Sequence, residues 1–431
     1  AWTDPVVGYR QALELAVRLD LFDEKDLPAC DQTSQRARAL RDIEIFEMTE
    51  TVYRKLMHHG DHRKELLANL GETIFNRALA TSTCQDSAHC LELYREAIKV
   101  LEGLDLVSAR DTRNGCLING SIILYVSGDT ETAFQWMDTA IEDFRQLASI
   151  EHNEERVRRL TKSLMNKASM LTNRQEHDDA LKYLDEAQHS CEELLQIANN
   201  DESWILMSKI QGNIGLAYFS AENYPRSLDA FNQAEDIAQM LLERQNTYEL
   251  AATIGFNNMF KSKVLRRLRR EDQAEKNLKE VIPFIQNQIE NEKREDLRVI
   301  LAEFSETLAE MYFVQDRYDE AMTEIHKADQ MLERIVVDEG QNEQLPVYGR
   351  IALKAFLMLY ASDSKQVAMD KGLNVTALWM QVIQQYQSTP EKIMAHIDLQ
   401  IYQLLKDLEF YGKADAASEM RRAVHTMGKK F

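Results

Sequence analysis

The chain contains 431 residues, and its 51 lysines and arginines against 71 aspartates and glutamates give a formal net charge of −20 at pH 7. Such a charge opposes general binding to nucleic acid or to an anionic membrane, and it favours a neutral or basic partner. The sequence contains no run of 18 apolar residues, so no segment is expected to span a membrane.

The cysteine content indicates a reducing, intracellular compartment. The five cysteines are irregularly spaced and form no CxxC pair, which is typical of free thiols. They are Cys30, Cys84, Cys90, Cys116 and Cys191. The chain has only 15 glycines and 6 prolines, which favours long helices separated by few turns.

Residues 1–63 are predicted to form helices that cap the N-terminal end of the fold. One helix is indicated by apolar residues at three- and four-residue spacing, namely Leu13, Ala16, Val17 and Leu21. A polar loop over 23–36 and a second helix over 38–58 follow it. Three histidines lie at the end of the second helix: His58, His59 and His62. Adjacent histidines on a helix point in different directions, and no cysteine or paired carboxylate completes a tetrahedral set, so we predict no metal site.

Residues 64–338 carry a pattern that repeats every 47 residues. A small residue recurs at Ser121, Ala168, Gly215, Ser262 and Ala309. A bulky residue follows three positions later, at Leu124, Leu171, Tyr218, Leu265 and Tyr312. A second small residue follows twelve positions after the first, at Ala133, Ala180, Ser227, Ala274 and Ala321. A period of roughly 20 to 50 residues indicates a solenoid, because one such unit cannot bury its apolar face alone.

This pattern resembles the tetratricopeptide repeat. The segments that match it best are NIGLAYFSAENYPRSLDAFNQA at Asn213–Ala234 and TLAEMYFVQDRYDEAMTEIHKA at Thr307–Ala328. The usual repeat of that family has about 34 residues, so each unit here is expected to have longer helices or a longer link. The resemblance extends over about Asn69–Met427. It implies an all-α, right-handed α-solenoid of about eight helix pairs.

The pattern decays in residues 339–431. Gly372 stands where a large apolar residue belongs, whereas Gly412 and Ala417 restore the register in the last unit. We interpret this stretch as degenerate repeats and a C-terminal cap, because a terminal unit must shield an apolar face from water.

A row of asparagines accompanies the repeat, each two residues before the first small residue of its unit. They are Asn69, Asn119, Asn166 and Asn213. The resemblance implies that these side chains face the inner groove, where an amide can donate to and accept from the backbone of an extended ligand. The alternative is that they brace one helix against its neighbour. Ile122 and Met165 are candidate contacts for a partner's apolar side chains, or else ordinary core residues.

The segment KSKVLRRLRRED at Lys261–Asp272 contains six basic residues among its first ten. The resemblance implies that Lys263 and Arg266 turn toward the groove, where they and Arg267 would clamp an acidic or phosphorylated group. The alternative is a solvated turn that balances nearby glutamates such as Glu271 and Glu275. A contact with nucleic acid is expected only if this basic stretch, residues 261–270, provides it.

The sequence lacks a GxxxxGKS/T phosphate loop, a GxSxG elbow and an HExxH pair, so we predict neither catalysis nor a cofactor. The resemblance implies an intracellular scaffold or adaptor that binds an extended peptide or a helix of another protein in its concave groove. The alternative is a sensing arm of a larger enzyme or regulator, such as a protease or a transcription regulator. Such an arm would gate a remote domain when the partner binds.

Overall fold

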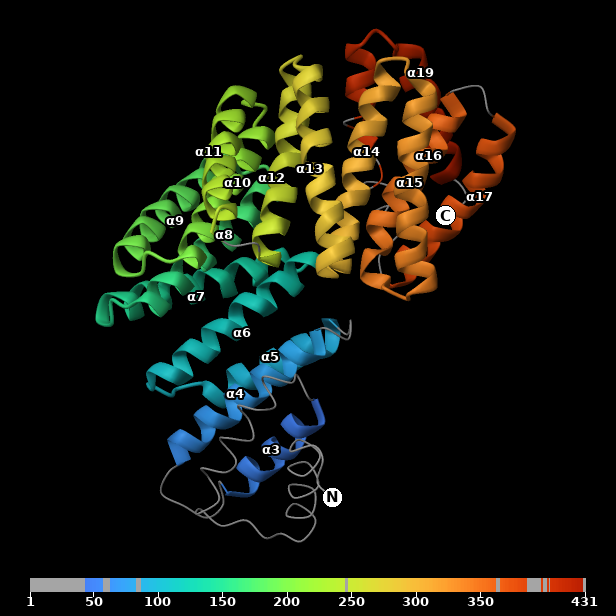
Figure 1. Cartoon of the computed structure of the whole chain (residues 1–431). Helices are drawn as coiled ribbons and strands as arrows, with labels where there is room; N and C mark the ends of the chain where they lie inside the picture. The colour runs from blue at the N-terminus through green and yellow to red at the C-terminus, as the bar shows by residue number, and fades with distance from the viewer. Residues whose placement is uncertain are drawn as a thin grey trace. The chain divides into compact units, whose positions relative to one another are not determined.

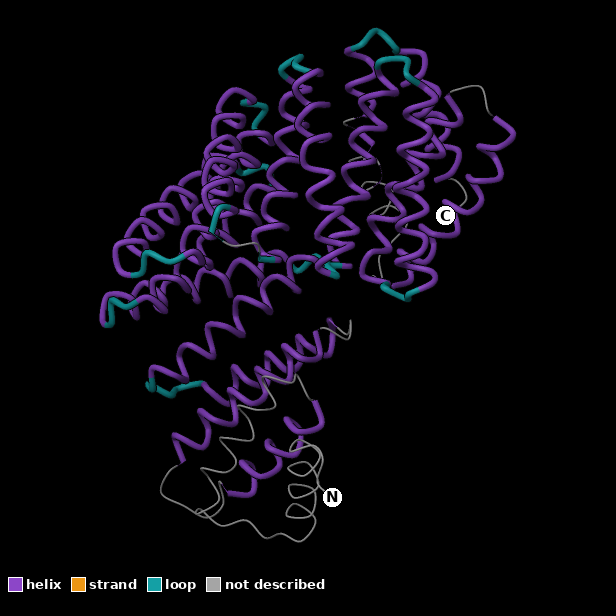
Figure 2. Tube along the Cα trace, viewed as in Figure 1, coloured by secondary structure: helices purple, strands orange, loops and turns teal. Residues whose placement is uncertain are grey.

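Helices and short turns make up the described part of the chain, and no β-strand occurs in it (Figure 2). The computed structural model describes residues 43–56, 63–82, 87–244, 247–361, 365–385, 397, 401–402 and 404–428. The predicted all-α class is confirmed for these residues. Several sequence predictions lie outside them: the first capping helix, the loop over 23–36, the histidines at 58–62, Cys30 and Cys84.

The chain divides into two compact units, Ala1–Asn199 (unit 1) and Asn200–Phe431 (unit 2). Successive helices of unit 1 pack in pairs, α4 with α5, α6 with α7 and α8 with α9 (Figure 1). The described helices of unit 1 are α3 (Ile43–Leu56), α4 (Arg63–Ser82), α5 (Ser87–Leu101), α6 (Val107–Val126), α7 (Thr130–Ile150), α8 (Glu154–Asn173) and α9 (His177–Ile197).

Unit 2 continues the same pairing, α10 with α11, α12 with α13, α14 with α15 and α16 with α17. Its long helices are α10 (Asp201–Ser220), α11 (Tyr224–Leu242), α12 (Tyr248–Arg267), α13 (Glu271–Glu292), α14 (Arg298–Val314), α15 (Tyr318–Glu333), α16 (Leu345–Ala361), α17 (Lys365–Gln385) and α19 (Ala414–Gly428). The short elements are η2 (Glu295–Leu297), η3 (Arg334–Asp338), η4 (Asn342–Gln344) and a helical stretch over 404–410.

The first helices of three repeats begin at capping residues that recur 47 positions apart, Asn153, Asn200 and Thr247. The side-chain oxygen of each accepts a hydrogen bond from the backbone N–H three residues later, at 3.1, 2.9 and 3.3 Å. That bond satisfies one of the amide groups that a helix start leaves without a partner, and it contributes about 1 kcal/mol. The start of each of these three helices is therefore fixed by one side chain.

The turn inside each helix pair has a fixed backbone form. Its left-handed residue recurs 47 positions apart at Gly128, Gln175, Glu222, Arg269 and Asp316, with φ of 93°, 64°, 58°, 60° and 63°. Glycine adopts this conformation freely, whereas the other residue types pay a steric cost of roughly 1–2 kcal/mol because of their Cβ atom. The repeat therefore conserves the geometry of the turn while its residue type varies.

The small residues of the repeat lie where the two helices of a pair come closest. In the α10–α11 pair, the hydroxyl of Ser227 donates a hydrogen bond to the carbonyl of Gly215 at 2.7 Å. A Cβ atom at Gly215 would come within 2.8 Å of the Phe231 ring. In the α12–α13 pair, Ala274 is fully buried and its carbonyl accepts from Ser262 at 3.4 Å. The repeated small residues therefore serve helix packing.

The substitution Ala274→Leu tests this packing. The added side chain has no space between α12 and α13, so the free energy of unfolding is expected to fall by about 1–3 kcal/mol. Chemical denaturation measures the change. Ala221→Leu is the matched control, because Ala221 is exposed in the turn before α11 and its replacement is expected to change stability by less than about 0.5 kcal/mol. Equal effects of the two variants would contradict the assignment.

In unit 2 the first helices of successive pairs form a layer of their own. Helix α10 packs directly on α12, and α12 packs on α14. Among the described residues, the second helices α11, α13 and α15 have no comparable contact with one another. Successive pairs thus converge on the side of α10, α12 and α14. We call these three helices, together with α16, the inner layer of unit 2.

Candidate ligand-binding surface

A cluster of charged side chains lies on the inner layer of unit 2. Helix α14 contributes Glu303, Glu306 and Glu310, whose three- and four-residue spacing places them on one face of the helix. Helix α16 contributes Arg350 and Lys354, which are also four residues apart. The rest of α14 is largely apolar and buried, so the three glutamates form a polar stripe on an otherwise hydrophobic helix.

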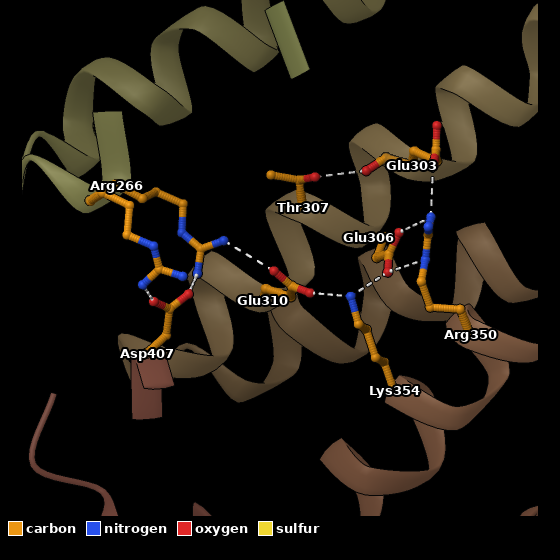
Figure 3. Close-up of polar contacts among 9 residues, drawn as sticks. Arg266, Glu303, Glu306, Thr307, Glu310, Arg350, Lys354 and Asp407 are labelled. Atoms are coloured by element: carbon orange, nitrogen blue, oxygen red, sulfur yellow. Dashed lines mark hydrogen bonds and ion pairs between the residues drawn. The ribbon is translucent and has the colours of Figure 1, made fainter. Parts of the chain in front are cut away.

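The side chains of α14 and α16 form a connected set of ion pairs (Figure 3). The Arg350 guanidinium donates to Glu303 at 2.7 Å and to both carboxylate oxygens of Glu306 at 2.9 and 3.1 Å. The Lys354 ammonium group bridges Glu306 and Glu310 at 2.6 Å to each. Each glutamate is therefore held by at least one cation from the next helix pair.

The set of ion pairs continues onto α12. The Arg266 guanidinium donates to Glu310 at 3.1 Å and to Asp407 at 2.7 Å. The neighbouring Arg267 also donates to Asp407. Asp407 lies in the helical stretch 404–410, some 140 residues further along the chain, and Figure 3 shows its carboxylate between the two guanidinium groups.

The ion pairs keep the two buried glutamates Glu306 and Glu310 charged. Burial by itself would raise the pKa of Glu310, but Lys354 and Arg266 hold that pKa well below its usual range. Burial also acts to raise the pKa of Glu306, and Arg350 and Lys354 reverse the effect. Glu306 is only 3% exposed and Glu310 only 5%, so removal of one partner would leave a buried charge without compensation.

Lys263 is the exception in this cluster. Among the described residues it has no carboxylate within ion-pair distance, and its ammonium group lies 4.9 Å from the centre of the Phe260 ring. The side chain is half-buried. Burial lowers the pKa of Lys263, although Glu306 and Glu303 act in the opposite direction. Lys263 is therefore a partly desolvated cation that lacks a direct counter-ion.

The side chain of Lys263 lines a cavity of about 190 Å³, which we call the charged cavity. Its lining includes five basic and three acidic side chains, so the cavity is positive within a chain of net charge −20. Its lining residues are Phe219, Phe260, Lys263, Arg266, Arg267, Glu306, Thr307, Glu310, Arg350, Lys354 and Asp407.

The three basic residues singled out in the sequence thus line one cavity. Arg266 is 7% exposed and pairs with Glu310 and Asp407, so it does not belong to a solvated turn. Of the basic residues in this stretch, only Arg269 and Arg270 are exposed, at the turn before α13. Lys261 points elsewhere and pairs with Glu235 of α11.

The asparagine row lies on the first helices of its units, and all four side chains are half-buried. In unit 1 the amide of Asn119 hydrogen-bonds to the Tyr94 hydroxyl, as a bracing residue would. Asn69 also has a polar partner. The side chains of Asn166, in unit 1, and Asn213, in unit 2, form no hydrogen bond with any residue that the structure describes. These two amides have donors and acceptors free for a ligand.

The two apolar candidates of unit 1 are not core residues. Ile122 on α6 is 42% exposed, and Met165 on α8 is half-buried. Both are accessible to a partner, and whether one binds there stays a prediction. Cys191, by contrast, is fully buried inside α9, and Cys90 and Cys116 are also buried free thiols.

Several members of the charged cluster were not identified from the sequence: Glu303, Glu306, Glu310, Arg350, Lys354 and Asp407. The repeat pattern could have indicated Glu303 and Arg350, because these two charged residues are one 47-residue period apart. The position of Asp407 had no such signal, since nothing in the repeat pattern links it to α12. Within the described ranges, no helix is long and apolar enough to cross a membrane, and no group of histidine, cysteine or carboxylate side chains is arranged to hold a metal ion.

Comparison with known proteins agrees with the repeat pattern. The sequence profile of the tetratricopeptide repeat matches residues 160–201, which take in most of α8 and all of α9. No curated protein matches the chain in sequence.

Solved structures share the fold at low sequence identity. The apo form of RapI has a TM-score of 0.55 at 13% identity, over 99% of this chain and 98% of that chain. A Rap protein complexed with Competence and Sporulation Factor has a TM-score of 0.53 at 12% identity, with the same coverage of 99% and 98%. Aspartyl phosphate phosphatase F from Bacillus subtilis has a TM-score of 0.53 at 13% identity, over 87% and 94%. At these identities the similarity establishes the fold alone. The recurring helix pairs, their 47-residue period and the match over 160–201 together show a helical-repeat fold that is similar to that of tetratricopeptide-repeat proteins.

Proposed function

We propose that unit 2 binds an extended stretch of another polypeptide along its inner layer, and that the charged cavity takes an acidic group of that polypeptide. The observation that carries this proposal is Lys263, a half-buried cation without a direct counter-ion among the described residues. It faces a cavity in which basic side chains outnumber acidic ones.

The size of the charged cavity favours one side chain of a larger ligand. Its volume of about 190 Å³ is below the roughly 300 Å³ at which small-molecule pockets begin. A carboxylate or phosphate placed there would pair with Lys263, whose charge has already lost part of its hydration. The rings of Phe219 and Phe260 border the cavity and can cover the apolar part of the same side chain.

The rest of the ligand is expected to be neutral or basic, because the chain as a whole carries a net charge of −20. Free amides such as that of Asn213 can hold the backbone of an extended chain irrespective of its sequence. The complex of a Rap protein with Competence and Sporulation Factor supports this proposal, since it shows a ligand on a protein of the same fold.

Other classes of function receive less support from the site. The carboxylates of Glu306 and Glu310 are paired and have pKa values held low, so neither is suited to act as a general base near neutral pH. Binding of nucleic acid would need free basic side chains along residues 261–270, and three of the six, Lys261, Arg266 and Arg267, are engaged in ion pairs.

A selection from a phage library of random dodecapeptides tests the proposal on the full chain. Selected peptides are expected to share one acidic position in an otherwise neutral or basic sequence. Synthetic copies with Asp, Asn or phosphoserine at that position then separate a carboxylate from a phosphate requirement. Peptides enriched without any acidic position would contradict the role of the charged cavity.

The free amides give a second test. Asn213→Ala is expected to weaken peptide binding about 2- to 10-fold, because one hydrogen bond contributes roughly 0.5–1.5 kcal/mol. Isothermal titration calorimetry measures affinity, and circular dichroism checks that helix content is unchanged. Asn119→Ala is the control, since the Asn119 amide is already bonded to Tyr94. If Asn213→Ala binds like the wild type, the Asn213 amide has no part in binding.

A further inference from the structure

The C-terminal part of the chain also contributes a side chain to the charged cavity. The carboxylate of Asp407 is 4% exposed and is held by Arg266 and Arg267, the residues best suited to clamp an acidic ligand. An acidic side chain from a remote segment therefore already pairs with two of the basic residues that line the charged cavity.

The segment 404–413 reaches three successive turns of unit 2. Lys406 pairs with Glu222 at 2.8 Å, in the turn before α11. The Tyr411 hydroxyl bonds to Glu271 at the start of α13, and Lys413 pairs with Asp316 in the turn before α15. The segment thus lies across the ends of the inner-layer helices, over the edge of the charged cavity.

Asp407 lines two cavities. One is the charged cavity, and the other is a cavity of about 440 Å³ that Arg266 and Arg267 also line. The second cavity is bordered by Lys406 and by Phe410, whose ring is 54% exposed. The Asp407 carboxylate therefore has space, and the Lys406 cation, in the second cavity.

Two kinds of contact hold the segment 404–413 on the protein, namely buried apolar side chains and partly exposed ion pairs. Leu404 and Leu408 are fully buried and anchor its backbone. Its outer contacts are ion pairs of partly exposed side chains, such as Lys406 with Glu222, and such pairs contribute about 0–1 kcal/mol. Exchange of the Asp407 carboxylate requires a local movement, and the leucines can stay in place.

We propose that Asp407 is an internal competitor for the acid-binding site: a ligand's acidic group must displace the Asp407 carboxylate from Arg266 and Arg267. This inference rests on the proposed function. Asp407 then sets the affinity and the selectivity of the site for acidic ligands. The site can bind an acid only in the fraction of molecules in which the Asp407 carboxylate has turned away from Arg266 and Arg267. The apparent dissociation constant is raised by the inverse of that fraction.

Asp407→Asn tests the inference. Two synthetic peptides from the phage selection are used, identical except for Asp or Asn at the acidic position, and the readout is the ratio of their dissociation constants. The wild type is expected to prefer the Asp peptide, because Lys263 pairs with its carboxylate. Asp407→Asn is expected to raise affinity for the Asp peptide at least tenfold and to leave the Asn peptide nearly unchanged. Asp415→Asn is the control, because Asp415 closely follows the segment, is exposed and lines neither cavity.

A second variant guards against a folding defect in Asp407→Asn. Lys413→Gln removes the ion pair with Asp316 but does not touch either cavity, and it is expected to move the ratio in the same direction by about twofold. If neither protein distinguishes the two peptides, the proposed function fails. If the wild type distinguishes them and both variants leave the ratio unchanged or reduce it, Asp407 only positions the arginines and the inference is overturned.

Discussion

Replacement of Glu310 with alanine is expected to lower the free energy of unfolding of the chain by about 3–5 kcal/mol. Glu310 is 5% exposed and lies between Lys354 at 2.6 Å and Arg266 at 3.1 Å. Its removal leaves two buried cations with one carboxylate partner fewer, and this desolvated charge is what destabilises the protein. Urea denaturation followed by circular dichroism measures the loss.

A matched glutamate on the next helix provides the control. Glu320 of α15 pairs with Arg317 at 2.6 Å, but it is exposed to solvent. Water and salt screen such a pair, so Glu320→Ala is expected to leave stability nearly unchanged. A loss below about 1 kcal/mol for Glu310→Ala would show that the ion pairs of the inner layer are solvated, and the description of the charged cluster would be wrong.

The largest effect on binding is expected from Lys263→Met. Methionine keeps much of the apolar stem of Lys263 but removes the cation that faces the charged cavity. Loss of one member of a buried charge pair costs roughly 2–5 kcal/mol, which corresponds to a loss of affinity of about 30-fold or more. Titration calorimetry with the selected Asp peptide measures this change, and the Asn peptide is expected to bind both proteins alike.

Lys261→Met is the matched control for Lys263, since both lysines lie on α12. Lys261 pairs with Glu235 away from the charged cavity, so its replacement is expected to leave peptide affinity within about twofold of the wild type. The outcome that would remove Lys263 from the site is an equal loss of affinity in the two variants, or no loss in either.

The fold could be predicted from the sequence because its determinants are local and periodic. A small residue such as Gly215 and its partner Ser227 mark the close approach of two helices in every unit, and a single unit therefore reveals the helix pair. The caps at Asn153, Asn200 and Thr247 carry the same period and would have placed the helix starts within one residue.

The left-handed turns could not be predicted from residue type alone. A positive φ like that of Gly128 occurs at Gln175, Glu222 and Arg269, but in a sequence only a glycine indicates that conformation. Tertiary packing of the two flanking helices imposes the turn on the other residues. The resulting geometry has a further effect, since it places the Arg269 guanidinium against the Phe410 ring of the segment 404–413.

The candidate site was only partly accessible from the sequence. Lys263 and Arg266 could be identified because repeat geometry assigns a face to each position of α12. Asp407 could not, because it reaches Arg266 across 141 residues, and contacts of that range follow from the packing of the whole unit. Charge patterns report which side chains are basic, whereas the structure alone reports which of them are already paired.

A crystal structure of the full chain with the selected Asp peptide tests the central claim most directly. The account predicts that the peptide lies along α10, α12 and α14, with its acidic side chain in the charged cavity beside Lys263. A peptide bound only to the second helices α11, α13 and α15, with the charged cavity unchanged, would contradict it.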